Sequence, residues 1–178
     1  PLAHYANMTH HVCEREESIQ RVSNAFWSGR PASYPNYGST KKRRLHEINY
    51  VLQQLQSLDG SLGSLVDIGC GTGSTVTCLQ ELTDISSYYC YDISSGMLST
   101  LDTRSLRGAT IHSNIVDLAN LPAGFSFPKA DVTICFGVFQ YLSDEVVSKL
   151  LRNINSRSLL IRDACYMPHE GRQVINTY

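Results

Sequence analysis

The residues best suited to chemistry lie at 66–73, where an apolar strand pattern runs into a turn with three glycines. A backbone without Cβ atoms can turn sharply and pass close to a ligand. The amide groups that open the following helix point at whatever occupies the turn. Asp67 adds a carboxylate two residues before the first glycine. A glycine turn alone is a weak signal that also fits a dinucleotide site or a purely structural turn, but this acid at this spacing favours a ligand site.

Two further acids follow the next two strand patterns. Asp92 comes about twenty residues after the glycines, where an open α/β sheet places a carboxylate against ribose hydroxyls. Asp92 can also cap the helix pattern that follows it, and the two roles are compatible. Asp117 follows the third strand pattern, in a loop, where an aspartate often bonds its own backbone. Asn114 is the competing side chain for a ligand contact at that strand end.

The elements that must position these groups alternate between strand and helix. A helix pattern lies at 74–82, and strand patterns lie at 64–68, 87–91, 110–116, 130–136 and 158–163. This alternation predicts an α/β, Rossmann-like fold with a mostly parallel sheet and helices on both faces. Such sheets bind ligands beyond the carboxyl ends of their strands, where the candidate residues lie.

Four segments in this order resemble the motifs of class I S-adenosylmethionine-dependent methyltransferases, namely 66–73, 91–98, 117–122 and 137–144. The resemblance covers about residues 60–165 and implies an enzyme that uses S-adenosyl-L-methionine and releases S-adenosyl-L-homocysteine. In this family the acid of the third segment usually faces the adenine amino group, and the strand end before the fourth borders the methyl donor. The resemblance therefore implies cofactor contacts from Asp67, Gly69, Cys70, Gly71, Thr72, Gly73, Asp92, Ile93, Asp117, Leu118, Phe136 and Gly137.

The length of 178 residues predicts a single domain over 1–178, with a helical, basic and aromatic substrate segment at 1–58 and a cofactor-binding core at 59–178. No apolar run approaches the roughly 18 residues of a membrane span. The six cysteines include no C-x-x-C pair, which indicates reduced thiols and a cytoplasmic location. The spacing of His4, His10, His11 and Cys13 matches no standard zinc site, so we expect no metal.

The ends of the chain predict a piece of a longer polypeptide. The chain begins at Pro1 without a methionine, and only fifteen residues follow the predicted strand at 158–163. A full class I methyltransferase sheet has seven strands, and the remaining residues can supply one more, at 173–178. We therefore expect a sheet that is reduced at its C-terminal end. The sequence leaves the oligomeric state open.

The N-terminal segment carries the clue to the substrate. Four cations crowd the predicted start of a helix, where the macrodipole disfavours them, so this end is expected to hold an anion such as phosphate. A solvated charge run is the alternative. Aromatic residues at 26–38 suit base stacking or simply cap the sheet. The residues expected to bind substrate are Tyr34, Tyr37, Lys41, Lys42, Arg43, Arg44, Phe139 and Tyr141.

No catalytic base is expected, because neither the Lys-Asp-Lys-Glu set of ribose methylation nor an N-P-P-Y loop is present. A nucleophile that is already unprotonated, such as guanine N7, needs only positioning. The chain loosely resembles RNA cap guanine-N7 methyltransferases, which implies capped RNA as partner, a role in mRNA processing, and a viral protein of the host cytoplasm. The alternatives are a small-molecule methyltransferase, an RNA 2′-O-methyltransferase and a non-catalytic module that binds RNA or a partner.

Overall fold

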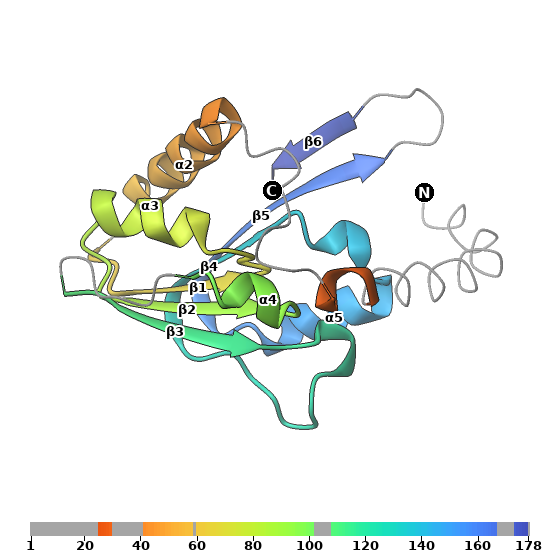
Figure 1. Cartoon of the computed structure of the whole chain (residues 1–178). Helices are drawn as coiled ribbons and strands as arrows, with labels where there is room; N and C mark the ends of the chain where they lie inside the picture. The colour runs from red at the N-terminus through yellow and green to blue at the C-terminus, as the bar shows by residue number, and fades with distance from the viewer. Residues whose placement is uncertain (1–24, 30–40, 59, 102–107, 167–172, 178) are drawn as a thin grey trace.

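The computed structural model describes residues 25–29, 41–58, 60–101, 108–166 and 173–177, and for 41–47 and 163–177 the backbone alone. Within these residues the sheet has six strands in the order β3-β2-β1-β4-β5-β6. Strands β1 to β5 run parallel, and β6 pairs antiparallel with β5 (Figure 1). The strands are β1 Ser64–Ile68, β2 Ser87–Asp92, β3 Thr110–Ile115, β4 Ala130–Phe136, β5 Ser156–Tyr166 and β6 Gln173–Thr177.

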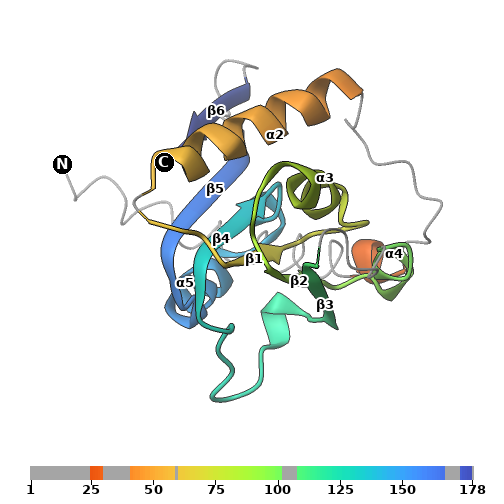
Figure 2. The ribbon, with the colours of Figure 1, turned by 90° about the vertical axis from the view of Figure 1, so that its left-hand side faces the viewer.

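Helices cover both faces of this sheet. Helices α2 and α3 lie on one face, and α5 lies on the other (Figures 1 and 2). Alternate residues of β1 enter the two cores: Leu65 packs with Val51 of α2 and Leu79 of α3, and Val66 packs with Leu150 of α5. The helices are α2 Lys41–Gln56, α3 Ser74–Leu82, α4 Ser95–Leu98 and α5 Asp144–Asn153, and two 3-10 turns are η2 Leu118–Asn120 and η3 Phe139–Tyr141.

The predicted Rossmann-like fold is confirmed. The observed bounds of β1, α3 and β4 equal the predicted ones, and β2 and β3 differ from prediction by one residue. Strand β5 is longer than expected at both ends. One strand, β6, follows β5 within the described part of the chain, as the reduced sheet required. The strand order reverses between β1 and β4, which is where open sheets of this kind bind ligands.

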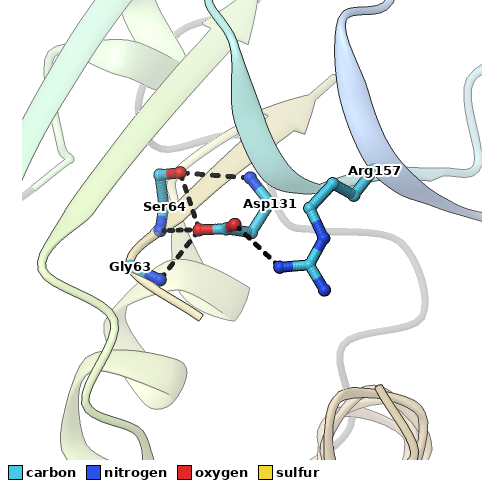
Figure 3. A network of polar contacts seen from close by, with 4 residues as sticks. All are labelled: Gly63, Ser64, Asp131 and Arg157. Atoms are coloured by element: carbon cyan, nitrogen blue, oxygen red, sulfur yellow. Dashed lines mark hydrogen bonds and ion pairs between the residues drawn. The ribbon is translucent and has the colours of Figure 1, made fainter. Parts of the chain in front are cut away.

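A polar network fastens three strands together at their amino ends (Figure 3). Asp131 Oδ2 accepts hydrogen bonds from the Gly63 amide at 2.8 Å and the Ser64 amide at 3.0 Å. The Ser64 hydroxyl also donates to Asp131 Oδ2, and Arg157 lies 3.4 Å from Asp131 Oδ1. The Gly63 amide contributes most to lowering the pKa of Asp131. This network holds β1, β4 and β5 in register at the end of the sheet opposite the glycine turn.

Other expectations concern membranes, metals and thiols. Among the described residues, no helix is long and apolar enough to cross a membrane. No group of three or more metal-ligating side chains comes together within the described ranges, and His4, His10, His11 and Cys13 lie outside them. The described cysteines are free thiols: Cys70, Cys78, Cys90 and Cys135.

Candidate functional site

The glycine turn between β1 and α3 is held against the end of β2. The amides of Gly69 and Cys70 donate to the carbonyl oxygen of Tyr91, at 2.7 and 3.1 Å. The Gly71 amide donates to Asp92 Oδ2 at 2.8 Å. The turn therefore forms a continuous polar rim with the carboxyl end of β2.

Two of the glycines are required by close packing. Gly69 and Gly73 both have positive φ, at 77° and 71°. A Cβ on Gly69 would collide with the side chain of Val138, and one on Gly73 would collide with Leu101. Gly71 differs, because a Cβ there would meet only Met97 Cε at 3.7 Å. Gly71 thus lies on the open side of the turn, where a ligand has room.

Asp92 serves the local structure and keeps capacity for a ligand. Besides the Gly71 amide on Oδ2, its Oδ1 accepts from the Ser94 amide at 2.8 Å. A carboxylate offers about four lone-pair positions, so these two bonds leave acceptor capacity on both oxygens. Burial raises the pKa of Asp92, although the backbone hydrogen bonds oppose that shift. The helix-start role that the sequence suggested belongs to Ser94, whose side chain accepts from the Met97 amide.

Asp67 is the unusual group of the site. Its side chain is 5% exposed, and no hydrogen bond joins it to another residue in the described part of the chain. Burial, and after it the charge of Asp92, raise the pKa of Asp67 to about 7. A buried carboxylate without a partner is unfavourable unless it is protonated or meets a cation. At neutral pH Asp67 is therefore protonated in part, or is balanced by a positively charged group.

Asp117 makes the local contacts that its loop position allowed. Its Oδ1 accepts from the Ala119 amide at 2.9 Å, and its Oδ2 accepts from the Asn120 side-chain amide at 2.7 Å. It thereby caps η2, and a contact with adenine stays a prediction. Asn114 lies exposed on the edge strand β3. Half-buried Ile93 and Leu118 flank the two strand ends and present apolar surface there.

Cys70 contributes its backbone and not a reactive thiol. The pKa of the Cys70 thiol is raised, most of all by a hydrogen-bonding contact with Cys90 and next by burial. A thiol that resists ionisation is a poor nucleophile. Thr72, also expected in the cofactor set, is half-buried in the same turn.

Aromatic side chains gather beyond the carboxyl end of β4. Phe136 ends the strand and Gly137 follows it, with the Gly137 amide donating to the Arg162 carbonyl at 2.8 Å. Phe139 and Tyr141 lie in η3, directly after this turn. Trp27, from a short helical turn near the N-terminus, meets Tyr141 edge to face with ring centroids 5.4 Å apart. The sequence prediction missed Trp27, although it is the single tryptophan of the chain and lies in the aromatic segment.

The remaining predicted substrate residues are not tested by this geometry. Tyr34 and Tyr37 lie outside the described residues. The basic run Lys41, Lys42, Arg43 and Arg44 forms the start of α2 as predicted, but its side chains lie outside the described part of the structure. Their contact with a substrate stays a prediction.

The described groups fit one kind of ligand. A carboxylate at Asp92 can accept hydroxyl hydrogens, and a buried acid at Asp67 can balance a positive charge. At Gly71, between these two acids in sequence, a Cβ would meet only Met97 Cε, so the backbone of the turn is not closely covered there. A molecule with ribose hydroxyls and an ammonium group satisfies all three features.

Comparison with known proteins gives consistent results. Residues 66–160 match a family model described as a methyltransferase domain. Malonyl-[acyl-carrier protein] O-methyltransferase of Bacillus cereus is 26% identical over 129 residues, which cover 72% of this chain and 45% of that protein. The Bacillus anthracis enzyme of the same name is 23% identical over 132 residues, or 72% of this chain and 47% of that protein. The chain thus spans about half the length of the curated relatives it matches.

Solved structures share the fold. A phosphoethanolamine N-methyltransferase of Haemonchus contortus, solved with phosphoethanolamine and S-adenosylhomocysteine, superposes with a TM-score of 0.63 at 20% identity. That match covers 89% of this chain and 34% of the other. An S-adenosylmethionine-dependent methyltransferase of Leishmania major gives a TM-score of 0.66 at 16% identity, covering 83% and 61% of the two chains.

Proposed function

The chain belongs to the family of methyltransferase domains, and on this premise we propose that it methylates a carboxylate oxygen of a small acyl acceptor. The cofactor is S-adenosylmethionine. When bound, it supplies a methyl group on a positively charged sulfur, which an unprotonated nucleophile attacks directly. The reaction forms an oxygen–carbon bond as the carbon–sulfur bond breaks, and S-adenosylhomocysteine leaves.

The cofactor roles follow from the rim described above. Asp92, whose position is fixed by the Gly71 and Ser94 amides, would accept hydrogen bonds from the ribose hydroxyls. Asp67 would balance the ammonium group of the methionine part, which would relieve its otherwise unfavourable buried charge. Ile93 and Leu118 would offer apolar surface to the adenine, and Asp117 would offer a carboxylate to it. The amides of the glycine turn complete the cradle.

The described residues that lie between β4 and α5 and those of the 25–29 turn offer no base, and this supports the proposal of a carboxylate acceptor. Residues 136–143 run from the last residue of β4 to the residue before α5. They contain no Asp, Glu, His, Lys or Arg, and neither does the helical turn at 25–29. An alcohol or an ammonium acceptor must lose a proton before or during attack. A carboxylate is already ionised at neutral pH, so it needs only to be positioned in line with the methyl group. The malonyl O-methyltransferase relatives support the same acceptor chemistry.

The cap-guanine alternative shares part of this logic, because guanine N7 also carries a free lone pair. Its support came from the basic run that starts α2 and from Tyr34 and Tyr37, whose side chains the structure does not describe. The relatives above favour the small acceptor instead. RNA 2′-O-methylation is less compatible, since the hydroxyl needs the base that residues 136–143 do not supply.

Transfer of a labelled methyl group tests the proposal. The protein is incubated with methyl-labelled S-adenosylmethionine and the malonyl thioester of N-acetylcysteamine, with the matched thioester whose carboxylate is an amide, or with capped RNA. We expect alkali-labile label on the carboxylate acceptor alone. Transfer to capped RNA but not to carboxylates would overturn the proposal. A variant with glutamine at Lys41, Lys42, Arg43 and Arg44 should then lose that RNA transfer.

A further inference from the structure

A short helical turn near the N-terminus lies over the acceptor side of the site, although it is distant in sequence from the strands that form the site. Residues 25–28 form this turn, and Figures 1 and 2 together place it beyond the carboxyl ends of the parallel strands, near α4. Trp27 meets Tyr141 of η3 with centroids 5.4 Å apart and ring planes at 65°. Phe26 packs on Trp27 at 4.9 Å and 84°. A continuous aromatic surface therefore borders the strand end at which methyl transfer is proposed.

Within the described part of the chain, Trp27 and Tyr141 contact each other but belong to neither core cluster, whereas the neighbouring Phe139 packs against the core that α5 covers. Trp27 is half-buried and Phe26 remains 40% exposed. Large aromatic side chains left partly open at the mouth of a site offer a flat apolar wall. They carry no charge, so they suit the body of an acceptor and not its carboxylate.

We propose that Trp27, with Tyr141, forms the wall against which the apolar body of the acceptor packs, and that Trp27 is a positioning and specificity-determining residue. The proposal rests on the proposed function and narrows its substrate class to carboxylates attached to an apolar or planar body. Small hydrophilic acids lack the surface that would hold them in line with the methyl donor. Trp27 touches the acceptor and not the cofactor rim, so it should affect the two ligands differently.

Kinetics separate this role from a structural one. In Trp27→Ala we expect the KM for the best acceptor to rise about ten-fold, with a smaller change in kcat, because the lost wall contact is worth roughly one decade of affinity. Affinity for S-adenosylhomocysteine should stay within about two-fold of the parent. Trp27→Phe should recover most of the acceptor affinity. Leu82→Ala is the matched control, because Leu82 is also large, apolar and exposed but ends α3.

Fluorescence tests the wall even if no acceptor is turned over. Trp27 is the single tryptophan, so its emission reports this site alone. The parent protein is saturated with S-adenosylhomocysteine and titrated with 3-phenylpropionate or with acetate. We expect 3-phenylpropionate to shift the emission at concentrations where acetate does not, and Tyr141→Ala to weaken that response.

Three results would contradict the role proposed for Trp27. The first is an equal or absent fluorescence response to both acids. The second is a Trp27→Ala variant that matches Leu82→Ala in acceptor KM, and the third is a Trp27→Ala variant that loses cofactor and acceptor binding together. Failure of the parent to methylate any carboxylate, with the 3-phenylpropionate response intact, would instead contradict the proposed carboxylate chemistry and leave the wall supported.

Discussion

Replacing Asp67 with asparagine should remove the contribution that this carboxyl group makes to the pH dependence of the domain's stability between about pH 5 and pH 8. Burial and the neighbouring Asp92 raise the pKa of Asp67 from 3.8 to about 7. Between these values the folded domain holds a proton that the unfolded chain has lost. The stability from this group is therefore complete below the unfolded pKa and falls as the pH rises to the folded pKa. A salt-bridged carboxylate shows the opposite pH dependence, because the stability that it contributes is lost as the pH falls.

The magnitude follows from the size of that change. At about 1.36 kcal/mol for each pKa unit, the full loss is on the order of 4 kcal/mol, of which about 3 kcal/mol falls between pH 5 and pH 8. The amide of Asp67→Asn stays neutral but is itself buried without a partner, which costs about 1–3 kcal/mol. Between about pH 5 and pH 8 the stability of the variant relative to the parent should therefore rise by about 3 kcal/mol, because only the parent loses this contribution.

Urea unfolding, followed by circular dichroism across this pH range, measures both curves. Glu81→Gln is the matched control, since Glu81 is an exposed acid on α3. S-adenosylhomocysteine should also release a proton on binding at about pH 6, because a bound ammonium group favours the ionised form of Asp67. Calorimetry in two buffers of different ionisation enthalpy detects that proton, and Asp67→Asn should lack it. Parallel pH curves for parent and Asp67→Asn would refute the reasoning.

Four further variants test other parts of the structure. Asp92→Ala and Gly71→Arg should stay folded but bind S-adenosylhomocysteine at least about ten-fold more weakly by calorimetry, since a charged acceptor bond is worth about 1.5–3 kcal/mol; unchanged affinity in Asp92→Ala would reduce Asp92 to a structural acid. Thr133→Val should raise the free energy of unfolding by about 1 kcal/mol in urea titrations, because the buried Thr133 hydroxyl has no hydrogen-bond partner among the described residues; a loss of stability would contradict this. Asp131→Ala should lower it by about 1–3 kcal/mol without changing cofactor affinity. Because hydrogen bonds from Gly63 lower the pKa of Asp131, that deficit should shrink as the pH falls below the ordinary carboxyl range, and a constant deficit would contradict the assignment.

Local sequence was sufficient for the elements that carry the cofactor rim. The run at 64–68 is apolar and ends at a glycine, so both the strand and its end could be predicted. Strand β5 was harder, because it begins at Ser156 and continues to Tyr166. Those polar and mixed ends carry no strand period. They extend because Ser156 pairs with Ala130 of β4, and Tyr166 pairs with Gln173 of β6. Such pairing depends on tertiary contacts that no local pattern encodes.

The roles of the three acids show a second limit. All three could be placed at strand ends from the sequence, yet their environments differ in ways that spacing does not record. Asp117 is occupied by Ala119 and Asn120, within three residues of itself. Asp92 is held by Gly71, which another strand brings to it. Asp67 is buried by the surrounding fold and has no hydrogen-bonding partner within the described structure. Charge state follows from burial, and burial is a property of the assembled sheet.

The sequence was least informative about the acceptor side of the site. Tyr141 could be predicted, because it follows a strand at a spacing tied to the sheet. Trp27 could not, since the segment around it has neither helix nor strand period and its partner comes from the other end of the domain. A family motif specifies how the methyl donor is held, and that part of the chain is the most regular. On the proposal above, the acceptor is selected by surfaces added to the same sheet, such as the Trp27 turn. Substrate class should therefore change with residues 25–29 and η3 while the glycine turn and Asp92 stay the same.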